Sequence, residues 1–234
     1  TIHAVAYSYL NETLGLEDFE AFLHEPATAD KFDLLMNTSA DYTHKDLVSN
    51  ESARQDVAKS LAIFSAFAEG VSLYSAFAVL YSFQLRNLLK GIGQQMKWSV
   101  RDESLHSKMG CKLFRHMCEE VPSLLEDCRD DVTKAAETML KAEEQYINKM
   151  FEQGDIENLR ANDLKQFIRK RLNEKLQELG YFDLGEYFTF DKKAAANLDW
   201  FYHLTGGHTH TDFFAVRPTD YSKANEGEDF EDIW

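Results

Sequence analysis

Glu103 and His106 are a pair of side chains whose types and spacing could do chemistry together. They are three residues apart, so on an α-helix they lie on one face, one turn from each other. A carboxylate and an imidazole at this spacing can share a metal ion. The same Glu-x-x-His spacing also occurs by chance on wet helix surfaces, so the pair alone is a weak sign of a metal site.

Glu69 strengthens the metal interpretation. It is the single charged residue in the apolar run 61–83 (LAIFSAFAEGVSLYSAFAVLYSF). A lone carboxylate on a helix buried on all sides is costly unless it is paired or binds metal. If the chain turns near 86–91, Glu69 and Glu103 lie about four turns from the same loop on antiparallel helices, and their side chains can face each other.

A third helix supplies His3, in the opening string TIHAVAY. Two carboxylates and two imidazoles in a bundle suit iron or manganese, which accept mixed oxygen and nitrogen ligands. Dimetal bundles use a Glu from each of two helices and a Glu-x-x-His from each of the other two. The motif of Glu103 and His106 is complete, whereas the Glu that would pair with His3 falls before Thr1.

Helical periodicity that could position these residues extends over most of 1–180. The sequence has only 11 Gly and 3 Pro among 234 residues, which favours long helices. The predicted helices are 1–15, 16–25, 28–44, one from a Ser52 cap into the 80s, 91–119, 123–154, and 162–180 with Asn162 as cap and Gly180 as stop. We find no alternating strand pattern and no repeat, so the fold class is all-α, a helix bundle.

The last segment has a different character. Residues 206–234 begin with two adjacent Gly, lack periodicity and end in the acidic stretch GEDFEDIW. We expect a helical domain over 1–205, followed by an extended, disordered tail over 206–234.

Composition excludes several classes of partner. The net charge is -15, from 40 acidic and 25 basic residues, which repels nucleic acid and anionic membranes. The run 61–83 is long enough to span a bilayer, but Glu69 inside it favours a buried bundle helix. The 3 cysteines show no C-x-x-C spacing, and no signal peptide is recognisable, so we expect a reduced, cytoplasmic compartment.

The strings AEGVSLYSAF, KWSVRDESLHSKMGCKLF and TIHAVAY resemble the small, radical-generating subunit of class I ribonucleotide reductase. The resemblance covers nearly the whole chain, and R-D-E-x-x-H is a specific part of it. It implies a ferritin-like bundle in which His3, Glu69, Glu103 and His106 bind a dinuclear iron, manganese or mixed centre. It also implies that Tyr7 carries a stable tyrosyl radical, formed when the metal pair reacts with oxygen or a reduced form of oxygen.

The resemblance assigns further roles along a radical relay. Asp102 matches an acid that hydrogen-bonds the metal-binding imidazole of His3 and so fixes its orientation. Tyr221 matches a tyrosine that passes the radical to the large catalytic subunit, where ribonucleotides become deoxyribonucleotides. The C-terminal GEDFEDIW matches the peptide that docks on that subunit. A homodimer is also implied.

The sequence departs from the family pattern in two places. The Glu expected before His3, a further Asp ligand and a relay Trp would all precede Thr1, so this chain would not complete a six-ligand centre alone. We therefore expect either trimming or a split gene whose second, N-terminal polypeptide supplies the missing ligands; Thr1 is of the residue type found after a splicing junction. Leu73 stands where many relatives have Phe beside the metals, which leaves the choice of metal open.

Two alternatives share the fold but not the function. Another ferritin-like dimetal oxidase or hydroxylase would explain the ligands but not Tyr7 or the tail. An iron-storage protein, or a scaffold fragment without activity of its own, would also need no docking peptide. Metal stoichiometry separates storage from the reductase.

Overall fold

A computed structural model describes Ala29 and residues 49–205 of the chain. The elements are α4 (Glu51–Ile63), the π-helix η2 (Phe64–Ser72), α5 (Tyr74–Leu85), α6 (Lys90–Glu120), α7 (Ser123–Asp127), α8 (Arg129–Met150), α9 (Ala161–Leu179), the 3₁₀-helix η3 (Phe182–Leu184), α10 (Lys192–Ala196) and α11 (Asp199–Thr205). Apart from an isolated bridge between Ile156 and Leu159, regular structure in the described ranges is helical. The all-α prediction is confirmed; the helices predicted within 1–44 lie outside these ranges, except for Ala29.

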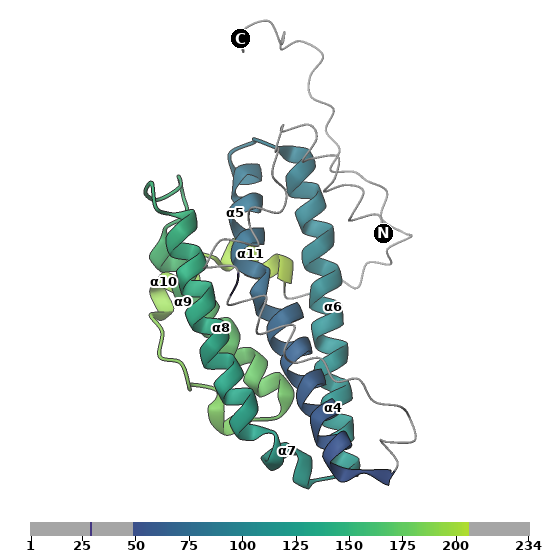
Figure 1. Cartoon of the computed structure of the whole chain (residues 1–234). Coiled ribbons are helices and arrows are strands. Elements are labelled where there is room, and N and C mark those ends of the chain that lie inside the picture. Colours follow the sequence, from purple (N-terminus) through teal and green to yellow (C-terminus); the bar gives the residue numbers. More distant parts are fainter. Residues whose placement is uncertain (1–28, 30–48, 206–234) are drawn as a thin grey trace, which may run out of the picture.

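The path α4–η2–α5 is close to one continuous rod and lies beside α6 (Figure 1). Helices α8 and α9 pack against each other and against η2, and α8 lies on the other side of the rod from α6 (Figure 1), whereas α9 also contacts α6. The segment η2 therefore contacts α6, α8 and α9 at the centre of the bundle. This is the segment that carries Glu69.

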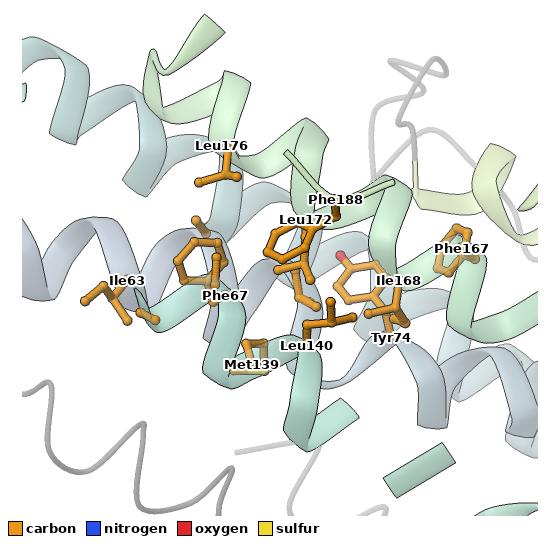
Figure 2. Close-up of a cluster of buried hydrophobic side chains, with 14 of the residues drawn as sticks. Ile63, Phe67, Tyr74, Met139, Leu140, Phe167, Ile168, Leu172, Leu176 and Phe188 are labelled. Carbon is orange, nitrogen blue, oxygen red and sulfur yellow. The ribbon is translucent and has the colours of Figure 1, made fainter. Parts of the chain in front are cut away.

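Apolar side chains from the rod, α8 and α9 form one buried cluster. Ile63 and Phe67 come from the rod, Met139 from α8, and Leu172 and Leu176 from α9 (Figure 2). All five are buried. Leu172 and Leu176 are one helical turn apart, so the periodicity that predicted α9 also selects its inward face.

The turn between α5 and α6 lies where the sequence predicted it. Residues 86–89 reverse the chain, with Asn87 at φ 63° and Leu89 at φ 47°. Helix α6 then begins at Lys90, close to the predicted start. The rod and α6 are therefore antiparallel neighbours, which allows the Glu69 and Glu103 side chains to face each other.

Helix ends differ from the predictions in three places. The cap of α4 is Asn50, whose side chain accepts from the Ala53 N–H at 3.3 Å, and not Ser52. The first N–H of α9, on Ala161, donates to Asp155 at 2.9 Å, so the predicted Asn162 cap is wrong. The predicted 123–154 helix is split into α7 and α8.

The rod is also the segment that raised the membrane question. Glu51–Leu85 is long and apolar enough to cross a membrane, and 67% of its most apolar window is buried in the structure. This burial favours a core helix. The prediction that 61–83 is buried on all sides is nevertheless wrong in part, because Phe64 and Leu73 are 49% and 40% exposed.

Gly110→Ala tests the close approach of α6 to η2. A Cβ at Gly110 would lie 2.5 Å from the Ser65 Cβ, a separation that forces the helices apart. We expect a loss of about 1–3 kcal/mol in the free energy of unfolding, measured with denaturant. The matched control is Gly91→Ala, in the same helix with nothing within 4 Å of the added Cβ, which should gain about 0.5–1 kcal/mol. Equal effects of the two variants would contradict the packing.

Candidate metal centre

Glu69 lies in a π-helical stretch. Residues Phe64–Ser72 form η2 between two ordinary α-helical segments of the rod. Such insertions are rare and are frequent at functional sites. The small residues Ala66, Ala68 and Gly70 let η2 pack closely against its neighbours. No sequence pattern predicted this change of helix type.

The structure brings Glu69 to the pair on α6. One Glu103 carboxylate oxygen lies 3.2 Å from His106 Nδ1, and one Glu69 oxygen lies 3.6 Å from the same nitrogen. One potential ligand atom of each residue lies within 4.8 Å of those of the other two. Of the four predicted metal ligands, the three in the described ranges are thus together. The fourth, His3, lies outside those ranges.

Burial and neighbouring charges shift the pKa values of Glu69 and His106. Burial, together with the neighbouring Glu103 carboxylate, raises the pKa of Glu69 to about 7, although His106 acts in the opposite direction. Burial lowers the pKa of His106, but the Glu103, Glu69 and Asp102 carboxylates more than offset this effect and leave its pKa raised. Two carboxylates held this close favour a bound cation, which removes their repulsion.

The cluster opens on one face of the described bundle. The Glu69 and Glu103 side chains are only 21% and 19% exposed, whereas His106 is 60% exposed. Large apolar side chains of α6, the helix that carries His106, are also exposed: Trp98, Leu105, Met109 and Leu113. None of the helices described covers His106, and the helix predicted over 1–15, which would carry His3, lies outside the described residues.

The donor set fits the metals that the sequence indicated. Two carboxylates and one imidazole are ligands that iron and manganese accept, and open positions remain for further ligands. The raised pKa of Glu69 agrees with this donor set, because burial and the Glu103 carboxylate make its ionised form costly and a bound cation would offset that cost. Glu69, Glu103 and His106 would hold the metal.

Of the other predicted site residues, Asp102 is the one that lies in the part of the chain that the structure describes. Asp102 is exposed on α6 and contributes negative potential at His106. Its predicted partner His3 lies outside the described residues, and so do Tyr7 and Tyr221.

Sequence reasoning missed a group of buried polar residues behind the cluster. The Tyr74 hydroxyl is 2.9 Å from the Ser104 hydroxyl, which follows Glu103 in α6. On α9, Arg171 donates to the Gly70 carbonyl, next to Glu69. One signal was available, because Arg171 and its neighbour Lys175 fall on the apolar stripe of α9.

Comparison with known proteins assigns the chain to a family. A family model described as "Ribonucleotide reductase, small chain" matches residues 1–185. The chain belongs to this family. The predicted recognition is thereby confirmed at the level of the family, and the matched range includes Glu69, Glu103 and His106.

Individual relatives agree with this family. The chain is 32% identical over 234 residues to a protein of Invertebrate iridescent virus 3 described as a probable ribonucleoside-diphosphate reductase small subunit, covering 96% of the chain and 61% of the relative. It is 30% identical over 266 residues to a similarly described protein of Invertebrate iridescent virus 6, covering 100% and 71%. A protein of Chlamydia pneumoniae described as ribonucleoside-diphosphate reductase subunit beta is 24% identical over 229 residues, covering 95% of this chain and 64% of the relative. The chain thus spans about three fifths to seven tenths of the length of these relatives.

A solved structure confirms the ferritin-like fold. A Bacillus halodurans protein described as a class I ribonucleotide reductase matches with a TM-score of 0.62 at 18% identity, covering 85% of this chain and 70% of that one. At this identity the likeness establishes the fold only.

Proposed function

We propose that this chain is the radical-generating subunit of a ribonucleoside-diphosphate reductase. The observation that carries the proposal is the cluster of Glu69, Glu103 and His106 in a member of the small-chain family. When bound, a dinuclear metal centre would supply the oxidising power, drawn from oxygen, that turns a tyrosine into a radical. Glu69, Glu103 and His106 hold and orient the metals, and the two carboxylates neutralise their charge.

Two residues near the start of the chain complete the oxidising end. His3 is the further imidazole ligand. Tyr7, one helical turn after His3, is the tyrosine that loses an electron and a proton. The sequence spacing supports this pairing, since residues four apart on a helix share a face. The open α6 face beside His106 leaves room for such a ligand.

The remaining residues serve transfer of the radical and assembly. Asp102 accepts a hydrogen bond from the His3 ring and holds its orientation. Tyr221 passes the radical on, and residues 227–234 dock on the large catalytic subunit, where ribonucleotides are reduced. The division into a helical domain over 1–205 and a tail over 206–234, a homodimer and a cytoplasmic location remain predictions. So do an N-terminal polypeptide with further ligands and the identity of the metal as iron, manganese or both.

Metal counting tests the proposed function. The chain, purified together with any N-terminal polypeptide that accompanies it, is loaded anaerobically with Fe²⁺ or Mn²⁺, freed of excess, and analysed for metal per chain. We expect about two ions per reconstituted site, as in other paired-metal centres. Storage of many iron atoms, or no bound metal under any loading condition, would contradict the proposal.

Peptide competition tests the docking role of the tail. A peptide with the sequence of 227–234, GEDFEDIW, is added to the chain assembled with its large subunit. We expect loss of reductase activity as the peptide occupies the docking site, with the aromatic Trp234 as its anchor. A peptide with Trp234→Ala is the matched control and should inhibit at least about tenfold more weakly, since loss of a buried aromatic anchor costs about 2 kcal/mol or more. Equal inhibition by the two peptides, or none by either, would contradict docking through this end.

A further inference from the structure

The backbone on both sides of Glu69 is held by side chains. The Ala68 carbonyl accepts a hydrogen bond from the Ser72 hydroxyl at 2.7 Å. The Gly70 carbonyl accepts one from Arg171 Nε, which comes from α9. A π-helix bonds each N–H to the carbonyl five residues earlier, and the second lone pair of such a carbonyl can accept from a side-chain donor. The two carbonyls that flank Glu69 have such donors.

Arg171 is placed to act on this segment. Arg171 is only 4% exposed, so its charged guanidinium group is shielded from water. Its guanidinium carbon lies 3.5 Å from the centre of the Tyr74 ring, a cation–π contact. Tyr74 in turn reaches Ser104, the residue after Glu103, through its hydroxyl at 2.9 Å. Arg171 thus contacts the Glu69 segment directly, and the Glu103 segment through one intervening side chain.

Close packing leaves η2 little freedom at this point. A Cβ added to Gly70 would lie 2.7 Å from the Ser107 hydroxyl of α6 and 2.9 Å from the Lys175 Cδ of α9. The Gly70 backbone is therefore wedged between the two helices. Its carbonyl points toward α9, where Arg171 is the donor, and the Glu69 side chain points toward α6, where Glu103 and His106 lie.

We propose that Arg171 is a positioning residue, which holds the π-helical turn at Gly70 so that the Glu69 carboxylate reaches Glu103 and His106. The part of this proposal that concerns metal rests on the proposed function, and the part that concerns backbone conformation does not. Without Arg171, the Gly70 carbonyl loses a buried, charged donor and η2 loses this tie to α9, so the segment is free to relax toward a regular α-helix. That rearrangement rotates Glu69 away from its partners.

Arg171→Met is the direct test, because it keeps an unbranched side chain and removes the donors. The first readout is hydrogen–deuterium exchange of the metal-free full chain, which reports the protection of the amides of Phe64–Ser72. The second is titration with Co²⁺, followed by its visible absorption. We expect exchange in Phe64–Ser72 to become at least about tenfold faster and Co²⁺ affinity to fall by about 10–100-fold, as for other groups that orient ligands.

Two further variants separate positioning from general damage. Arg169→Met, in the same helix, removes a partly exposed cation paired with Glu144 and leaves the Gly70 carbonyl alone. It should match the wild type in both readouts. Arg171→Lys keeps the charge and one donor, so it should recover part of the exchange protection and of the affinity.

The outcomes decide the proposal. Exchange of Phe64–Ser72 in Arg171→Met that equals exchange in Arg169→Met would overturn it. If Arg171→Met does not fold, Arg171→Lys decides. Faster exchange than in the wild type, confined to Phe64–Ser72, supports positioning. Exchange that is unchanged there, or that becomes faster by the same factor in α8, overturns it. A wild-type chain that binds no Co²⁺ would count against the proposed function instead, because the exchange readout needs no metal.

Discussion

Glu69→Gln is expected to weaken metal binding by about 100-fold or more, while raising the thermal stability of the metal-free chain. Removal of a ligand should exceed the 10–100-fold effect typical of groups behind the ligands. Metal-free, the same change removes a carboxylate that burial and Glu103 make costly to ionise, as the pKa of about 7 indicates. We expect a gain of about 1 kcal/mol in the free energy of unfolding after solvent screening. Metal titration and thermal unfolding measure the two effects.

The control for this variant lies further along α6. Glu119 is 3.1 Å from His116 Nδ1, a local pairing like that of Glu103 with His106, but both side chains are well exposed and no carboxylate from the rod is paired with them. Glu119→Gln should leave metal affinity and stability nearly unchanged. A Glu69→Gln chain that keeps full affinity, or loses both affinity and stability, would indicate that Glu69 is a structural residue and not a ligand.

Tyr7→Phe is expected to abolish the tyrosyl signal in electron paramagnetic resonance and, with it, reductase activity, while metal content stays the same. The change removes only the phenol oxygen, so the proton and electron that Tyr7 would give up are no longer available, and the apolar ring remains. Activity should fall at least about 1,000-fold, equivalent to about 4 kcal/mol, because the radical has no other source. Spectroscopy and metal analysis on the same sample separate the radical from the metal site.

Tyr9 is the natural comparison for Tyr7. It lies two residues further on and so on a different face of the predicted helix 1–15. Tyr9→Phe should retain the signal and its shape. A signal of the wild-type shape in Tyr7→Phe, or its loss in Tyr9→Phe, would move the radical to another residue.

The meeting of Glu69 with Glu103 was predictable because it depends on local rules. The turn near 86–91 and the extents of the flanking helices follow from helical periodicity, and equal distances from one turn place residues side by side on antiparallel helices. The motif of Glu103 and His106 needs only one helical turn. Both inferences agree with the distances in the cluster.

The π-helix was not predictable, because nothing in the sequence 64–72 distinguishes it from an α-helix. One donor to its carbonyls is Arg171, far along the chain. Arg171 and Lys175 do interrupt the apolar stripe of α9, but charged residues at such positions often extend to solvent. The pattern identifies them as unusual without indicating their partners.

The sequence also overestimated how fully the apolar run 61–83 is buried. One carboxylate in an apolar run suggested a helix surrounded on all sides, yet Phe64 and Leu73 are exposed in the described structure. Periodicity reports which face of a helix is apolar but not which neighbour covers it. Periodicity also fails for very short helices: α10 has only 5 residues, begins after the Asp191 cap, and was not predicted.

Anomalous diffraction from crystals of the chain loaded anaerobically with Fe²⁺ tests whether Glu69, Glu103 and His106 bind the metal. Data on both sides of the iron absorption edge locate bound iron without reference to activity. We predict iron peaks within coordination distance of these three side chains, about 3.5–4 Å apart if both metals are retained. Iron bound only elsewhere on the chain, with these three side chains unliganded, would contradict it.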